Sequence, residues 1–203
     1  MDAAAPARRR TPGRVRAGRR HARRNTGGHR VNEPLSYSDP GATEVAEPVW
    51  RRATPGFRRF ERTVVIGQGD DFWVEVSSRI LEWGIKTRSG FSIEPAKGDA
   101  LRVRAGADLS LVAHVGPLRI REPVRIVTVV ARRDRSGFAY GTRPGHPVSG
   151  EEAFVVHRGP DGTVSLTLRS LTRAPRGPWR LLYPIALVAQ RFYRRRYLRA
   201  LLA

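Results

Sequence analysis

The chain has 203 residues, no cysteine and a net charge of +20 at pH 7. The absence of cysteine excludes disulfides, thiolate metal sites and cysteine nucleophiles, and it fits a reducing compartment. No run of about 20 apolar residues is present to span a membrane, and the N-terminus lacks the apolar stretch of a secretory signal. We therefore expect a soluble, cytoplasmic protein.

The positive charge is concentrated at the two ends of the chain. Residues 1–30 contribute +9 and residues 173–203 contribute +8, which leaves +3 for the segment between them. Almost all of this charge is arginine, since the lysines are Lys86 and Lys97 alone. Arginine binds phosphate bidentately, but the codon usage of a GC-rich genome produces the same bias. Composition therefore does not by itself indicate nucleic-acid binding.

Residues 1–30 show no periodicity and almost no large apolar residue, so we expect a disordered tail. One alternative is a basic arm for nucleic acid or an anionic surface. Another is a start-site artefact in which Val31 is a misread GTG start codon; a natural peptide from before Val31 would contradict it. Residues 31–203 are expected to form a single α+β domain.

The first expected elements are a strand and an amphipathic helix. Residues 35–60 are expected to be irregular because proline and glycine recur there. A short β-branched strand follows at Thr63–Ile66. A helix is then expected, with Asp70 as its N-cap and Gly84 as its C′ glycine. Its apolar residues share one face and are interpreted as core: Phe72, Trp73, Val76, Ile80 and Trp83.

The remaining chain reads as strands and a closing helix. After a loop near residues 95–98 the apolar period changes to two. Strands are expected at 101–104, 109–115, 124–131, 138–142, 153–157 and 163–168, with turns at Ala105–Gly106, Ser136–Gly137 and Asp161–Gly162. Pro184 suits the first turn of a helix that runs to about Leu202. Its apolar residues include Ile185, Val188, Phe192, Tyr193, Tyr197 and Leu201, and Arg191, Arg194, Arg195 and Arg199 occupy the remaining surface.

These elements predict an α+β fold. Short turns make neighbouring strands antiparallel, so we expect a curved antiparallel sheet of about six to seven strands. One N-terminal helix and one long C-terminal helix are expected to cover one face. This order resembles the helix-grip fold, in which a sheet wraps around the final helix. The likeness implies an apolar cavity between the sheet and that helix.

The segment from Gly137 to Phe154 reads GFAYGTRPGHPVSGEEAF. It resembles the signature of uncharacterised protein family 0548, GFAYGT-x-PGHP-x-SGEE-x-F, with Arg143 and Val148 at variable positions. The resemblance covers about residues 35–202. Further matching positions are Tyr37, Gly41, Thr43, Gly67, Gly69, Trp83 and Tyr197 to Leu201. The resemblance implies no particular activity.

The motif also supplies the candidate site residues Tyr140, Thr142, His146, Glu151 and Glu152. A histidine near carboxylates is typical of general acid–base catalysis or of half a metal site. However, adjacent residues on a strand point to opposite faces, which separates Glu151 from Glu152. A segment so rich in glycine and proline also encodes a difficult connection between strands.

Three hypotheses follow for the function. The first is a non-catalytic binder of a small apolar or amphipathic molecule, held between the sheet and the C-terminal helix, with residues 140–152 at the edge of its cavity. The second is a nucleic-acid or anionic-surface protein that acts through Arg191, Arg194, Arg195 and Arg199. The third is a hydrolase-like enzyme using His146 with Glu151 or Glu152. No catalytic residue, metal site or cofactor is assigned, and the sequence leaves the oligomeric state open.

Overall fold

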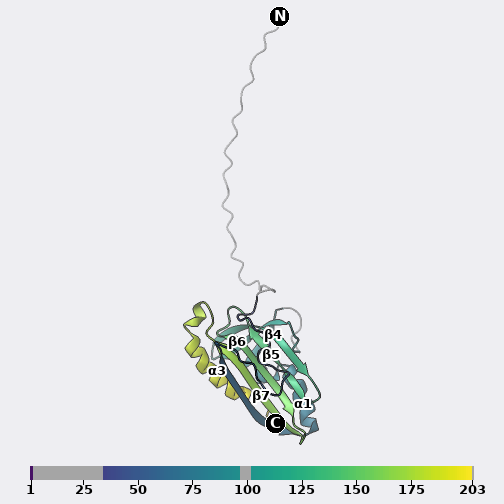
Figure 1. The fold of residues 1–203 in the computed structure, drawn as a ribbon. Coiled ribbons are helices and arrows are strands. Elements are labelled where there is room, and N and C mark those ends of the chain that lie inside the picture. Colours follow the sequence, from purple (N-terminus) through teal and green to yellow (C-terminus); the bar gives the residue numbers. More distant parts are fainter. Residues whose placement is uncertain (2–33, 97–101, 203) are drawn as a thin grey trace.

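The computed structural model describes residues 34–96 and 102–202, together with Met1. The Arg-rich tail and Leu101 lie outside the described residues. A seven-stranded antiparallel sheet dominates the fold (Figure 1). Its strands are β1 (Arg58–Gln68), β2 (Phe91–Pro95), β3 (Asp108–Val115), β4 (Leu118–Ala131), β5 (Arg135–Thr142), β6 (Ser149–Arg158) and β7 (Thr163–Arg173). The helices are α1 (Asp70–Leu81), α2 (Gly84–Thr87), a 3₁₀ turn at Pro178–Arg180, and α3 (Tyr183–Tyr197).

The strands lie in the order β1-β7-β6-β5-β4-β3-β2. Strands β2 to β7 thus form a meander, and β1 closes against the last strand. This arrangement confirms the predicted α+β class and the antiparallel sheet. The predicted turn at Asp161–Gly162 joins β6 to β7, where Gly162 adopts a φ of 81°. That left-handed conformation favours glycine.

The main core lies on the face of the sheet that carries the helices, here called the helix face. Phe138 on β5 and Phe154 on β6 point to this face and meet Trp73, Val76 and Ile80 of α1. The apolar face predicted for this helix is therefore confirmed as core. In Figure 1, α1 and α3 lie toward different edges of the sheet.

The opposite face is covered by residues 34–57, here called the covering segment. Val45 packs against Ala139, Ala153 and Val155, which alternate with the residues of the helix face. Farther along, Trp50 packs against Leu171. The central strands are consequently buried on both faces. The segment is irregular as predicted, but the sequence did not reveal this covering role.

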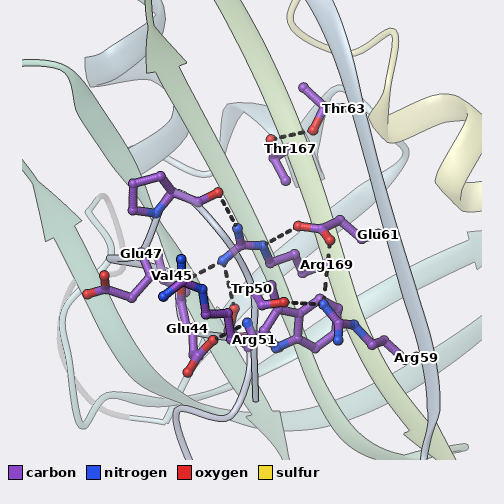
Figure 2. Close-up of polar contacts among 12 residues, drawn as sticks. Glu44, Val45, Glu47, Trp50, Arg51, Arg59, Glu61, Thr63, Thr167 and Arg169 are labelled. Carbon is purple, nitrogen blue, oxygen red and sulfur yellow. Dashed lines mark hydrogen bonds and ion pairs between the residues drawn. The ribbon is translucent and has the colours of Figure 1, made fainter. Parts of the chain in front are cut away.

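Arg169 of β7 holds the covering segment in place (Figure 2). Its side chain is 1% exposed. The guanidinium donates to the carbonyls of Thr43, Glu44 and Pro48 at 3.1, 2.6 and 3.0 Å, and to the Glu61 carboxylate at 2.8 Å. A planar group with five N–H donors is suited to several fixed acceptors at once. Arg169 thus connects the segment to the sheet through a guanidinium that is itself almost fully buried.

Two predictions for α1 are wrong. The N-cap is Gly69, whose carbonyl accepts the Trp73 N–H at 3.1 Å, and Asp70 is the first helical residue. Beyond the helix, Trp83 adopts the left-handed conformation, with a φ of 64°, while Gly84 begins α2. The Trp83 ring packs edge-on against Phe138 at 5.2 Å, and such burial can offset backbone strain.

The strand predictions also need correction. Residues 102–104 form no strand: Val103 is buried and donates to the carbonyl of Leu81, so its apolar character reflects one core contact. The sequence reading missed β2. Gly137 lies within β5 rather than in a turn. Glycine is required at this position because a Cβ there would come within 2.2 Å of the Phe154 carbonyl oxygen.

The C-terminal helix begins as predicted, with Pro184 in its first turn, but it ends at Tyr197 rather than near Leu202. Tyr197 and Leu201 are buried, while Ile185, Val188 and Phe192 are exposed. These apolar residues therefore have different environments, and α3 keeps an apolar stripe on its outer side. Among the described residues, no helix is long and apolar enough to cross a membrane.

Candidate functional site

A cavity of about 220 Å³ lies between the helix face of the sheet and α3. We call it the sheet–α3 cavity. Its walls are largely apolar and come from strands on one side and α3 on the other. Examples are Phe91, Ala113 and Ile120 from the sheet and Leu182, Ile185 and Ala186 from the helix segment. The cavity lies where the likeness to a helix-grip fold led us to expect one.

All five candidate residues of the motif border this cavity, but they divide into two groups. The first group borders the cavity with its polar side chains or bonds to a buried lysine, Lys86, beneath it. This group comprises Tyr140, His146 and Glu152. Thr142 instead braces the motif: its hydroxyl accepts the Gly150 N–H at 2.8 Å and lies 2.6 Å from the Ser36 hydroxyl. The structure therefore does not present Thr142 as a free functional group.

Glu151 is likewise engaged away from the cavity. Its carboxylate accepts hydrogen bonds from the Tyr37 hydroxyl at 2.6 Å and from the Gly41 and Thr43 N–H groups at 2.7 and 2.9 Å. The prediction that Glu151 and Glu152 point to opposite faces is thus confirmed. Tyr37, Gly41 and Thr43 also matched the family pattern at the sequence level, and they prove to be the partners of Glu151.

Beneath the cavity lies a buried cluster built on Lys86 of α2. The Lys86 ammonium donates to the hydroxyls of Tyr140 and Tyr197 at 2.6 and 2.7 Å and to the Glu152 carboxylate at 3.0 Å. Its nitrogen also lies 4.3 to 5.0 Å from the centres of four aromatic rings, those of Phe91, Tyr140, Phe154 and Tyr197. All three ammonium donors therefore have acceptors, and the charge has aromatic faces around it.

The cluster fixes the protonation of its members. Tyr140 donates its own proton to Glu152, which leaves that carboxylate with two partners. Burial lowers the pKa of Lys86, while the charges of Glu152 and Glu122 oppose this effect. Burial and the Glu152 charge raise the pKa values of Tyr140 and Tyr197 well above the usual value, so both hydroxyls keep their protons.

His146 borders the cavity and carries one buried donor without a partner in the described part of the chain. The Val148 N–H donates to its Nδ1 at 3.1 Å, so the proton of the neutral ring lies on Nε2. Burial and the Lys86 charge lower the pKa of His146 to about 3, which keeps the ring neutral. Among the described residues, Nε2 has no hydrogen-bond partner.

A carboxyl group, that of Glu122 on β4, lies near this donor. Its Oε2 atom lies 3.8 Å from His146 Nε2, too far for a hydrogen bond, and its side chain is 18% exposed. Burial raises the pKa of Glu122 to about 7, against the effect of Lys86 and together with that of Glu152. A carboxyl of this kind is present in both protonation states near neutral pH.

Comparison with known proteins gives the same family as the motif. A family model described as "Domain of unknown function (DUF1990)" matches residues 36–200. This chain belongs to that family. A UPF0548 protein of Deinococcus radiodurans is 33% identical over 178 residues, which cover 82% of this chain and 89% of that protein. The resemblance to uncharacterised protein family 0548 is thereby confirmed.

Solved structures resemble this DUF1990 chain in fold. A hypothetical protein of Helicobacter pylori gives a TM-score of 0.53 at 12% identity, over 73% of this chain and 87% of that chain. A major latex-like protein of Panax ginseng gives a TM-score of 0.42 at 13% identity, over 70% and 98% of the two chains. The first likeness supports the fold alone, and the second is too weak to support a conclusion.

Three polar residues of this DUF1990 site escaped the sequence reading: Lys86, Glu122 and Tyr197. Two weak signals were present. Lys86 is one of two lysines in a chain with 36 arginines, which indicates a place where a compact ammonium is needed. Glu122 lies two residues from both Ile120 and Val124, so on a strand it shares their inward face. Neither signal indicates that these side chains meet.

The structure does not assemble the hydrolase-like set. Glu151 faces away from His146, whose neighbouring carboxylate is Glu122. The two local hydroxyls are occupied by structural contacts: Ser149 donates to the Ser36 carbonyl at 3.0 Å, and Thr142 bonds Gly150. His146 therefore has no nucleophile to activate among these residues.

The four arginines of the second hypothesis have different surroundings. Arg191, Arg195 and Arg199 are exposed, as predicted. Arg194 is partly buried: its guanidinium lies 3.8 Å from the centre of the Phe60 ring and donates to the Ser170 hydroxyl at 2.7 Å. A groove between α3 and β1 brings further arginines to this side, and its basic lining comprises Arg58, Arg59, Arg62, Arg191, Arg194 and Arg195.

Proposed function

We propose that this DUF1990 protein is a non-catalytic binder of a small amphipathic molecule, held in the sheet–α3 cavity. The observation that carries the proposal is the combination of apolar walls with a buried donor that has no partner, His146 Nε2. Apolar pockets with a few fixed polar groups are the usual form of small-molecule sites. A buried donor without an acceptor is unfavourable unless a ligand or water supplies one.

The arrangement of α3 supports the same proposal. The helix lies over the cavity in a helix-grip-like manner, and its exposed residue Ile185 also borders the cavity. Ile185 therefore belongs to the rim, where a ligand enters. The proposal includes a cytoplasmic location and a single domain over residues 31–203, as composition suggests.

The test is native mass spectrometry of the full-length chain, purified without detergent. A defined added mass is expected, and the same compound is expected after denaturation and solvent extraction. If the protein stays at its apo mass and takes up no apolar probe at millimolar concentration, the binding proposal is wrong.

We also propose a second candidate function, docking of α3 on an anionic lipid surface. Leu181, Ile185, Val188 and Phe192 recur at helical spacing and are 86%, 66%, 67% and 56% exposed. Arg191 and Arg195 flank this apolar stripe. Interfacial helices combine these two features. Lipid is favoured over nucleic acid because a phosphate backbone would leave the stripe uncovered.

Vesicle sedimentation checks the docking candidate. The full-length protein is expected to bind vesicles that contain phosphatidylglycerol and to bind phosphatidylcholine vesicles at least tenfold more weakly, since each arginine contributes about 1 kcal/mol near an anionic surface. The double variant Ile185→Glu and Val188→Glu should lose most of this binding. Val65→Glu, at an exposed valine outside the stripe, is the matched control. Equal binding by both variants, or binding to an RNA oligonucleotide instead, would contradict the candidate.

A further inference from the structure

We propose that the polar end of the ligand is a carboxylate, which accepts a hydrogen bond from His146 Nε2 beside Glu122. This inference rests on the proposed binding function and specifies its substrate class. It makes the protein a binder of small apolar acids rather than of apolar molecules in general. The carrying observation is the juxtaposition of an unpartnered histidine donor and a carboxyl group 3.8 Å away in a largely apolar cavity.

The donors and acceptors at the polar end of the cavity, here called the polar floor, determine which ligand group can bind there. The polar floor comprises Lys86, Glu122, Tyr140, His146, Glu152 and Tyr197. His146 Nε2 can only donate, because Nδ1 already accepts from Val148. The Tyr197 oxygen accepts from Lys86, so its own proton is left as a second donor that borders the cavity. Glu152 Oε2 already accepts from Lys86 and Tyr140, and a protonated Glu122 adds a further donor. The unused donors of the polar floor therefore favour a ligand group with several hydrogen-bond acceptors. An ionised carboxylate is such a group, since it only accepts.

The charges around the floor favour the same choice over an amine. Lys86 lies beneath the cavity and is 0% exposed. Its charge repels an ammonium group and attracts an anion, and this effect is stronger in an apolar environment than in water. The neutral His146 ring presents an N–H that an ammonium cannot accept. An ionised Glu122 would attract an ammonium group, so the site favours an acid over an amine when Glu122 is protonated.

Glu122 makes the binding of an acid dependent on pH. Two ionised carboxylates this close repel each other, so the acid binds when Glu122 is protonated and can donate. The groups that face Glu122 are Lys86 from α2, Glu152 from β6, Tyr140 from β5, His146 from the loop after β5, and Tyr193 and Tyr197 from α3. The tyrosines and His146 keep one protonation state between pH 6 and 8.5, whereas Glu122, with a pKa of about 7, changes its state within this range.

Titration calorimetry of the full-length protein with octanoate, 1-octanol and octylamine tests the inference. At pH 6 octanoate is expected to bind at least tenfold more tightly than octylamine. With a Glu122 pKa of about 7, octanoate should bind about thirtyfold more weakly at pH 8.5 than at pH 6. The affinity for octanol, which carries no charge, should change far less between pH 6 and pH 8.5.

Glu122→Gln identifies the group responsible. The amide is neutral at every pH, so the ratio of octanoate affinities at pH 6 and pH 8.5 should fall from about thirty to near one. Glu94→Gln, at a partly exposed glutamate on β2 paired with Arg119 and Arg121, should keep the full ratio. Circular dichroism of each variant verifies that it is folded.

Two results would overturn the inference while leaving the cavity as a binding site. These are equal binding of octanol, octanoate and octylamine, or an octanoate affinity that does not change with pH in the unsubstituted protein. Failure of all three probes to bind would instead remove the proposed binding function and this inference with it.

Discussion

Lys86→Met is expected to lower the free energy of unfolding by about 4 kcal/mol, because it leaves Glu152 as an uncompensated buried charge. Lys86 is 0% exposed and Glu152 11% exposed. Methionine keeps most of the side-chain volume but supplies no donor to Glu152, Tyr140 or Tyr197. Urea denaturation measures the loss.

A second substitution separates the charge effect from packing. Adding Glu152→Gln to Lys86→Met removes the unpaired charge, and the amide oxygen still accepts from Tyr140, so at least half of the lost stability should return. Arg102→Met is the matched control. It removes a surface ion pair with Glu82 whose side chains are 55% and 51% exposed, and it should change stability by less than about 1 kcal/mol. A full loss that Glu152→Gln does not relieve would mean that packing, not charge, is the function of Lys86.

Arg169→Met is expected to destabilise the fold by about 3–5 kcal/mol, because it leaves the carbonyls of Thr43, Glu44 and Pro48 without their buried donor. The covering segment should loosen first. Trp50 is 3% exposed, so chymotrypsin should cleave after it slowly in the unsubstituted protein and rapidly in the variant. Proteolysis and urea denaturation together measure the local and the global effect.

Arg132 provides the control for this prediction. It donates to the Ala46 carbonyl of the same segment at 3.2 Å, but from an exposed position where water can replace it. Arg132→Met should therefore cost less than about 1 kcal/mol and leave Trp50 protected. If the two variants behave alike, Arg169 is not the anchor of the covering segment.

The sequence predicted those parts of the fold that depend on local patterns. The Asp161–Gly162 turn, the alternation along β3 and β7, and the apolar face of α1 need no knowledge of distant residues. The failures occur where a distant partner decides the conformation. Trp83 takes a left-handed backbone because of its burial against Phe138, and Gly137 is required by the backbone of β6 opposite it.

The candidate site was predicted only in part for the same reason. The motif supplies Tyr140, His146 and Glu152, which border the cavity, but also Thr142 and Glu151, which brace the covering segment. Residue type alone does not separate these roles. Lys86, Glu122 and Tyr197 come from three other elements, and their meeting depends on the register of β4 and on the docking of α2 and α3.

The central claim is that a small molecule occupies the sheet–α3 cavity, and a cavity-blocking variant tests it most directly. Native mass spectra are compared for the unsubstituted protein, for Ala186→Phe, which places a ring in the cavity, and for Leu187→Phe, on the side of α3 facing β1. We predict a bound mass in the unsubstituted protein and in Leu187→Phe, and its loss in folded Ala186→Phe. An equal yield of the bound molecule from all three proteins would contradict the account.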